Sequence, residues 1–220
     1  DLRHALTTAA THHAAAISLR SEKPRPIGKC LDARSFVNAI VGLHATGGST
    51  NHTLHLPAMA AAGGINLRWQ DFADLSDIVP LLARIYPNGQ ADVNHFHAAG
   101  GMGFVIRELL SAGLLDGSAA TIWGNCLADY GVEPKLDKDR LVWSLAPEET
   151  YDASVLRGVA NPHASTGGLK MLEGNLGRSV IKVSAVSEDR HKISAPAIVF
   201  ETEAQVKEAF ADGQLEKDCV

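Results

Sequence analysis

The run Gly47-Gly48-Ser49-Thr50-Asn51-His52 concentrates groups that could bind a ligand. Glycine lets the backbone take positive φ and lets a ligand approach closely. Free N–H groups at the start of a following helix, together with the helix dipole, favour an anion such as a phosphate or carboxylate. Ser49 or Thr50 can cap that helix. Spacing alone favours an ordinary Gly-Ser-Thr helix start, and no Gly-Lys-Ser/Thr follows to make a Walker A motif.

Histidine spacing gives a second candidate, a metal site. His52 and His55 stand three residues apart on one predicted helical face, and His95 and His97 form a pair on a predicted loop or extended piece. Such pairs bind a metal only with further ligands, usually including a carboxylate, and none lies nearby in the sequence. We therefore interpret these histidines as ordinary hydrogen-bonded side chains.

The cysteines do not indicate a site by themselves. Cys30, Cys126 and Cys219 lie far apart, are odd in number and include no Cys-x-x-Cys pair. This argues against a disulfide framework and against a self-contained zinc site. Each is interpreted as a small buried hydrophobic residue.

Two further polar segments contain glycine. Residues 88–96 place several polar groups in a predicted turn ahead of Gly100-Gly101, and loops of this kind often line sites. Residues 173–178 end on Arg178, whose guanidinium suits a phosphate. Both segments are also compatible with plain turns, so the residues alone leave the two interpretations open.

Composition limits the class of protein. The chain has 220 residues, 45% of them hydrophobic, with a net charge of −5. No basic stripe suggests a nucleic-acid partner, and no apolar run is long enough to cross a bilayer. No signal-peptide pattern stands at the start, so we expect a cytoplasmic protein. The first residue is not methionine and both ends look cut, so we expect a segment of a longer chain.

The elements that must position these residues are mainly helical at first. Apolar spacing predicts helices over residues 2–20, 34–45 (capped by Asp32), after Thr50 through 62 with a kink or late start at Pro57, 71–78, and 102–115. Period-two alternation predicts a strand from 179 through Ile181, Val183 and Ala185, a second strand over 197–200, and a helix opened by a Thr202/Gln205 capping box. We place a domain boundary near 166, giving parts 1–165 and 166–220.

Taken together, the chain resembles the family of dihydroxy-acid and 6-phosphogluconate dehydratases. The resemblance is weakest over residues 118–165 and rests on motifs that occur in the family's order. These motifs are Val37-Asn38-Ala39-Ile40-Val41-Gly42-Leu43, Ala45-Thr46 with the run to Thr53, Tyr86-Pro87-Asn88-Gly89, Ala91-Asp92-Val93-Asn94-His95-Phe96, Ala98-Ala99-Gly100-Gly101, Gly174-Asn175-Leu176-Gly177-Arg178, Lys182-Val183-Ser184-Ala185-Val186 and 195–220.

Within the family, the resemblance favours the 6-phosphogluconate branch. The branched-chain dihydroxy-acid dehydratases usually have small apolar residues after Gly-Gly-Ser-Thr-Asn, whereas this chain has His52-Thr53. The resemblance implies a hydro-lyase of the Entner–Doudoroff pathway that dehydrates 6-phospho-D-gluconate. It also implies a homodimer, an iron–sulfur cluster of the 4Fe-4S type and a divalent metal such as magnesium or manganese. The implied fold is α/β: a mainly helical segment of an N-terminal α/β domain, followed by the start of a swivelling β-rich domain.

The resemblance also marks what this chain lacks. The family's cluster cysteines, its serine base and its late metal-binding glutamate belong to motifs outside these residues, so no catalytic residue or metal ligand is assigned here. We expect the segment alone to be inactive. His44 stands where the family pattern predicts an apolar residue. The competing interpretations are a dihydroxy-acid or other sugar-acid dehydratase, and a non-catalytic binding or scaffold domain.

The predicted substrate is a phosphorylated sugar acid, and the candidate residues that would contact it fall into two groups. The first comprises Ser49, Thr50, Asn51 and His52, which we expect to hold the acid or phosphate end. The second, with weaker support, comprises Asn94, His95 and Arg178.

Overall fold

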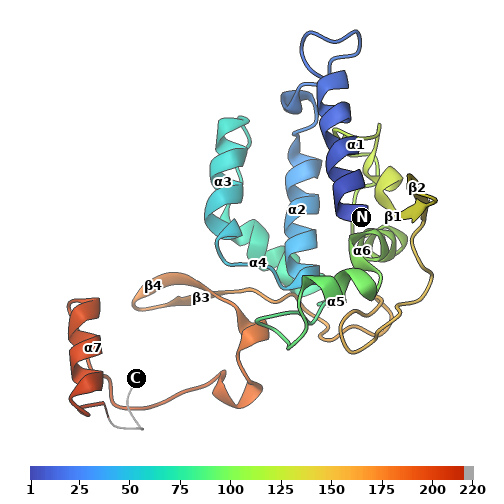
Figure 1. The fold of residues 1–220 in the computed structure, drawn as a ribbon. Helices are drawn as coiled ribbons and strands as arrows, with labels where there is room; N and C mark the ends of the chain where they lie inside the picture. Colours follow the sequence, from blue (N-terminus) through green and yellow to red (C-terminus); the bar gives the residue numbers. More distant parts are fainter. Residues whose placement is uncertain (216–220) are drawn as a thin grey trace. The chain divides into compact units, whose positions relative to one another are not determined.

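The computed structural model describes residues 1–215, which fall into two compact units that divide after Ala185. The first unit contains α1 (Leu2–Ala16), η1 (Ile27–Lys29), α2 (Ala33–Thr46), α3 (His52–Ala62), α4 (Trp69–Ile78), α5 (Val93–Ala98), α6 (Gly101–Ser111), η2 (Leu127–Tyr130), β1 (Val132–Asp137), β2 (Arg140–Leu145), β3 (Lys170–Gly174), β4 (Gly177–Ile181) and η3 (Val183–Ala185) (Figure 1). The second unit contains η4 (Glu188–Arg190) and α7 (Glu203–Ala211).

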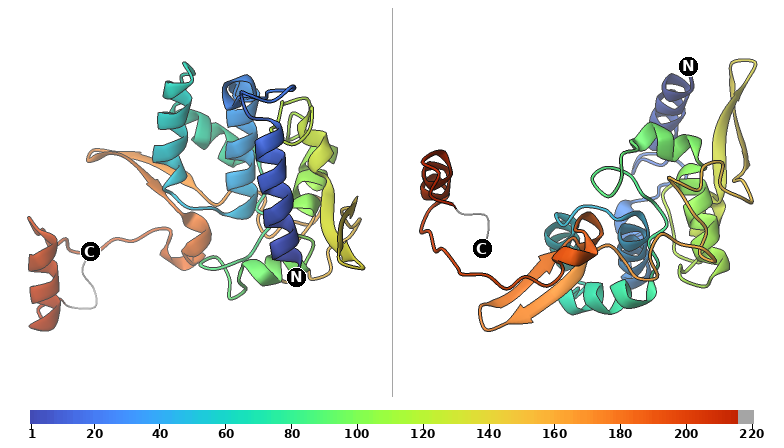
Figure 2. Two further views of the ribbon diagram at one scale, coloured as in Figure 1. Left: turned by 45° about the horizontal axis from the view of Figure 1, so that its top comes forward. Right: turned by 90° about the horizontal axis from the view of Figure 1, so that it is seen from below.

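Helix α2 is the centre of the first unit. Its contacts reach α3 and α4 on one side and α6 on the other, an arrangement visible in Figures 1 and 2. One hydrophobic cluster joins α2 to α6 and to residues 79–83, and a second joins α2 to α3, α4 and Leu169. Because α2 packs against other elements on two sides, its direction and ends are set by packing as well as by its caps.

The ends of α2 were predicted correctly. The Asp32 side chain accepts the Ser35 N–H at the start, and Gly47 closes the helix in the left-handed conformation, with φ of 60°. Phe36 lies in the core, whereas the neighbouring Val37 is 42% exposed.

Proline is accommodated inside α3. Helix α3 runs from His52 to Ala62 with Pro57 in its interior. Proline removes the donor that would bond to the carbonyl of Thr53, four residues earlier. The Trp69 Nε1–H donates to that carbonyl instead, at 3.0 Å, so the freed acceptor is satisfied from α4.

Two antiparallel hairpins form the β structure of the described residues. In the first, β1 pairs with β2 from Val132↔Leu145 to Asp137↔Arg140 around Lys138 and Asp139, both of which have positive φ. This hairpin was not predicted. In the second, β3 pairs with β4 from Lys170↔Ile181 to Gly174↔Gly177.

Two strand predictions were wrong. The predicted strand through Val183 and Ala185 ends at Ile181, and Val183–Ala185 forms a 3-10 turn. Residues 197–200 form no strand, because they have no partner strand within residues 1–215. The capping box was correct: the Thr202 side chain accepts the Gln205 N–H at the start of α7.

The mixed α/β class is confirmed, with a mainly helical part followed by strands. The domain boundary near 166 stays a prediction, although residues 166–185 pack within the first compact unit. Within residues 1–215, no helix combines the length and apolar character needed to span a bilayer.

Candidate functional site

The 47–52 loop, residues 47–52, connects α2 to α3. Gly47 is buried, whereas Ser49, Asn51 and His52 are exposed and Thr50 is partly buried. The four predicted substrate-contacting residues are therefore adjacent and largely accessible. Together they offer two hydroxyls, one amide and one imidazole.

The loop has few free backbone donors. The N–H of His52 donates to the Ser49 carbonyl at 3.1 Å, and the N–H of Asn51 donates to the Ser49 hydroxyl at 3.2 Å. Within residues 1–215, only the N–H groups of Ser49 and Thr50 lack an acceptor among those from Gly47 to Leu54. An anion at this helix start would therefore meet two free N–H groups rather than a full turn of them.

The capping prediction for Ser49 and Thr50 was wrong. Asn51 is the N-cap residue of α3, and it makes no side-chain cap bond. The Ser49 hydroxyl accepts the N–H of Asn51, the N-cap residue itself, rather than an N–H of the first helical turn, because a short turn precedes the helix.

The imidazole of His52 has a defined orientation. Its Nδ1 lies 3.0 Å from the Ser49 carbonyl, which can only accept, so Nδ1 carries the proton. In the neutral ring, Nε2 is then an acceptor suited to a substrate hydroxyl. A protonated ring would donate from both nitrogens and suit a carboxylate or phosphate.

A side chain far along the sequence holds the start of the loop. The Asn88 Nδ2 donates to the Gly47 carbonyl at 3.0 Å, and the Ser184 hydroxyl donates to Asn88 Oδ1 at 3.0 Å. We call Gly47, Asn88, Gly168 and Ser184 the Gly47 junction. Asn88 and Ser184 stand in the quoted motifs, but their role could not be found from spacing because the contacts span 41 and 96 residues.

A largely apolar cavity of about 430 Å³ lies beside the loop. It is lined by residues of α2 and α6 and by a segment over 115–127, with Gly48 and His52 among its wall residues. The α2–α6 cavity therefore brings an apolar surface next to the imidazole of His52.

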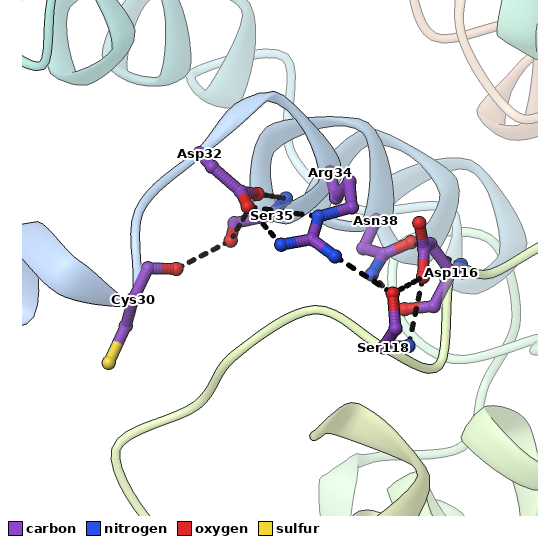
Figure 3. Close-up of polar contacts among 7 residues, drawn as sticks. All are labelled: Cys30, Asp32, Arg34, Ser35, Asn38, Asp116 and Ser118. Atoms are coloured by element: carbon purple, nitrogen blue, oxygen red, sulfur yellow. Dashed lines mark hydrogen bonds and ion pairs between the residues drawn. The ribbon is translucent and has the colours of Figure 1, made fainter. Parts of the chain in front are cut away.

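A polar network supports the far wall of this cavity (Figure 3). The Asn38 amide donates to the Asp116 carbonyl and accepts the Asp116 N–H, both at 2.9 Å. Arg34 forms an ion pair with Asp32 at 2.6 Å and donates to the Ser118 hydroxyl at 2.8 Å. These contacts attach the 116–118 segment to the first turns of α2.

Asn94 and His95 lie on a helix rather than on the predicted loop. Asp92 caps α5 by accepting the N–H groups of Asn94 and His95, and its carboxylate also meets His95 Nδ1 at 2.8 Å. These hydrogen bonds, led by the one from the His95 N–H, lower the pKa of Asp92 to about 2. Both candidate side chains are exposed, and their polar atoms are partly engaged in the cap. The strong local hydrogen bonds of Asp92 account for the helix.

Arg178 lies on β4 next to the turn of the second hairpin. Its guanidinium meets the Gln70 amide oxygen at 3.4 Å and Glu173 at 4.0 Å. The turn end of this hairpin points away from α2 (Figures 1 and 2). Within the described residues, no hydrogen bond or ion pair links Arg178, Asn94 or His95 to the 47–52 loop, so their roles stay predictions.

His44 is fully buried behind the loop, with 0% exposure. Its Nε2 donates to the Phe72 carbonyl at 2.9 Å, while Nδ1 has no partner within residues 1–215. Burial, aided by the positive charge of Lys170, lowers the pKa of His44 to about 4. Gly167 packs directly on the ring, where a Cβ would lie 2.8 Å from it. The sequence marked His44 as unusual but not as part of the core.

Metal ligands do not gather among the described residues. No three or more His, Cys, Asp or Glu side chains within residues 1–215 are grouped so as to hold an ion. Cys30 is buried and Cys126 is partly buried; Cys219 lies outside the described residues. Of the paired histidines, His52 and His95 make side-chain hydrogen bonds, to the Ser49 carbonyl and to the Asp92 carboxylate.

Comparison with known proteins matches two stretches of the chain to one family. The model of the dihydroxy-acid/6-phosphogluconate dehydratase N-terminal domain matches residues 1–130, and that of the C-terminal domain matches residues 154–220. The chain belongs to the dihydroxy-acid/6-phosphogluconate dehydratase family. Between the two matched stretches lie residues 131–153, which include the β1–β2 hairpin.

Among individual relatives, similarity is higher to the phosphogluconate branch. The chain is 54% identical over 220 residues to a phosphogluconate dehydratase of Rhizobium meliloti and 51% identical over 220 residues to one of Zymomonas mobilis. Each alignment covers 100% of this chain and 36% of the relative, so the chain spans about a third of their length. A dihydroxy-acid dehydratase of Caldanaerobacter subterraneus is 34% identical over 189 residues, covering 85% of this chain and 32% of the relative.

Proposed function

We propose that the protein containing this chain is a hydro-lyase that converts 6-phospho-D-gluconate to 2-dehydro-3-deoxy-6-phospho-D-gluconate in the Entner–Doudoroff pathway. Identity of about half of all positions over the whole chain to proteins named phosphogluconate dehydratase supports this proposal. The reaction removes the proton at C2 and the hydroxyl at C3 as water, and the resulting enol becomes the 2-keto product.

Incubating the purified full-length protein anaerobically with 6-phospho-D-gluconate tests the activity. Formation of the 2-keto-3-deoxy product, followed by mass spectrometry, is the expected result. If no product forms with any sugar acid or dihydroxy acid, the alternative of a non-catalytic binding or scaffold domain is favoured.

We further propose that the 47–52 loop holds one end of the substrate. The observation that carries this is the exposure of Ser49, Asn51 and His52 on a loop whose two ends are anchored. Hydroxyl, amide and imidazole groups suit the hydroxyls of a sugar acid, and the free N–H groups of Ser49 and Thr50 suit a carboxylate or phosphate oxygen.

Alanine replacement in the full-length enzyme tests this role. Asn51→Ala and His52→Ala each remove a hydrogen bond to an ionised or strongly polar ligand, so each should raise KM by about tenfold or more. His12→Ala, an exposed histidine of α1, is the control and should leave KM unchanged. Wild-type KM and kcat in both loop variants would refute the assignment.

The cofactors are proposed for the whole enzyme only. The family resemblance implies an iron–sulfur cluster, which would act as a Lewis acid on the leaving hydroxyl, and a divalent metal such as magnesium or manganese. The residues described here do not fit either group, since they include no cluster of metal-ligating side chains within 1–215. We assign no ligand and derive no step through them.

We also propose that the whole enzyme is a cytoplasmic homodimer. This rests on the family resemblance. Light scattering of the purified full-length protein would test the dimer, with twice the chain mass expected and a monomer mass contradicting it.

A further inference from the structure

The Asn88 amide joins two segments of the chain at one point. Its Nδ2 faces the Gly47 carbonyl and its Oδ1 faces the Ser184 hydroxyl, each at 3.0 Å. Because the Gly47 carbonyl can only accept, the amide has one possible orientation. The Ser184 hydroxyl also lies 3.3 Å from the Gly168 carbonyl, which accepts the Ser184 N–H at 3.3 Å; Asn88 Oδ1, at 3.0 Å, is the nearer of the two acceptors for the hydroxyl proton. The Asn88 backbone is itself fixed by an N–H bond to Ile85 at 2.7 Å.

The junction is packed without spare room. Gly47 has φ of 60°, and a Cβ there would overlap the Asn88 amide. A Cβ on Gly168 would lie 2.6 Å from the Ser184 hydroxyl and 3.2 Å from Gly47 Cα. Glycine at these two positions is what lets the Asn88 amide and the Ser184 hydroxyl reach the backbone.

The other end of the loop is fixed locally. The Thr53 hydroxyl donates to the Thr50 carbonyl at 2.8 Å, and His52 Nδ1 donates to the Ser49 carbonyl. Asn88 therefore supplies the long-range restraint at the start of the loop, and the local bonds supply it at the end.

We propose that Asn88 and Ser184 are positioning residues for the 47–52 loop: Ser184 orients the Asn88 amide, and the amide fixes the Gly47 carbonyl so that Ser49 to His52 are held in their binding geometry. This rests on the proposed role of the loop in binding substrate. Holding the loop in place before substrate arrives lowers the ordering cost of binding, so the effect falls on KM.

The positioning role is tested by the kinetics of Asn88→Ala, Ser184→Ala and the double variant in the full-length enzyme. Asn88→Ala should raise KM for 6-phospho-D-gluconate by about fivefold, and Ser184→Ala by about twofold to threefold, with kcat less affected. Because Ser184 acts through Asn88, Ser184→Ala should add nothing in the Asn88→Ala background. Asn161→Ala, at an exposed asparagine, is the control and should match wild type.

Hydrogen exchange separates this proposal from the proposed function. In Asn88→Ala, peptides covering residues 43–54 should exchange faster, while peptides from α6 should exchange at the wild-type rate. Unchanged exchange over 43–54, or independent multiplicative effects of the two variants on KM, would overturn the positioning role. Faster exchange with wild-type KM in Asn88→Ala, Asn51→Ala and His52→Ala would instead refute substrate binding by the loop.

Discussion

Replacing His44 with leucine should remove a specific part of the protein's pH-dependent stability. His44 is fully buried, and burial lowers its pKa to about 4 from the ordinary value of 6.5. The Phe72 carbonyl, which accepts from Nε2, favours the protonated ring and so works against this shift, while Lys170 adds to it. The folded protein therefore binds this proton less readily than the unfolded chain does.

The sign and size follow from linkage. Above pH 6.5, His44 is neutral in both states and its full contribution is present. As pH falls from 6.5 to about 4, the unfolded chain takes up the proton first, so folding stability declines. The difference between the two pKa values corresponds to about 3 kcal/mol, of which about 2 kcal/mol is lost by pH 5.

The assay is urea denaturation of wild type and His44→Leu at pH 7.5 and pH 5, followed by tryptophan fluorescence. Leucine removes the imidazole donor from the Phe72 carbonyl, a cost that does not depend on pH. Between the two pH values, wild type should lose about 2 kcal/mol more than the variant. His163, whose pKa is also lowered by burial, contributes equally to both proteins and cancels. Parallel pH profiles would refute the reasoning.

Three further substitutions test the packing around the site by denaturation. Gly47→Ala should lower the free energy of unfolding by more than about 2 kcal/mol, because φ is 60° and the added Cβ overlaps the Asn88 amide. Gly42→Ala, in open space on α2, is the control and should be neutral or stabilising. Equal effects of the two substitutions would contradict this account. Asn38→Ala should cost about 1–3 kcal/mol, since it leaves the Asp116 N–H without an acceptor and the Asp116 carbonyl with only the Ala119 N–H, at 3.3 Å. A cost near zero would mean that water replaces the amide fully. Asp92→Ala should lower the urea midpoint through loss of the α5 cap, and an unchanged midpoint would show that the cap contributes little.

Sequence predicted the features whose signals are local. Asp32 and Thr202 began helices where their side chains could bond the next turn. The 47–52 loop was visible for the same reason, because its residues are contiguous.

Features that depend on distant partners were missed or misplaced. The β1–β2 hairpin turns on Lys138 and Asp139, which lack the Asn-Gly or Asp-Gly signal of such turns. Residues 197–200 have the composition of a strand but no partner within 1–215. The contact between Asn88 and Ser184 spans 96 residues, so spacing could not indicate it.

The measurement that tests the central claim most directly compares substrates. The kcat/KM of the full-length enzyme is determined anaerobically for 6-phospho-D-gluconate and for a branched-chain 2,3-dihydroxy acid. A site built to hydrogen-bond the sugar hydroxyls and bind an anion should prefer 6-phospho-D-gluconate by at least about a hundredfold. Equal values would contradict the proposed function, and a preference for the branched-chain acid would place the enzyme in the other branch of its family.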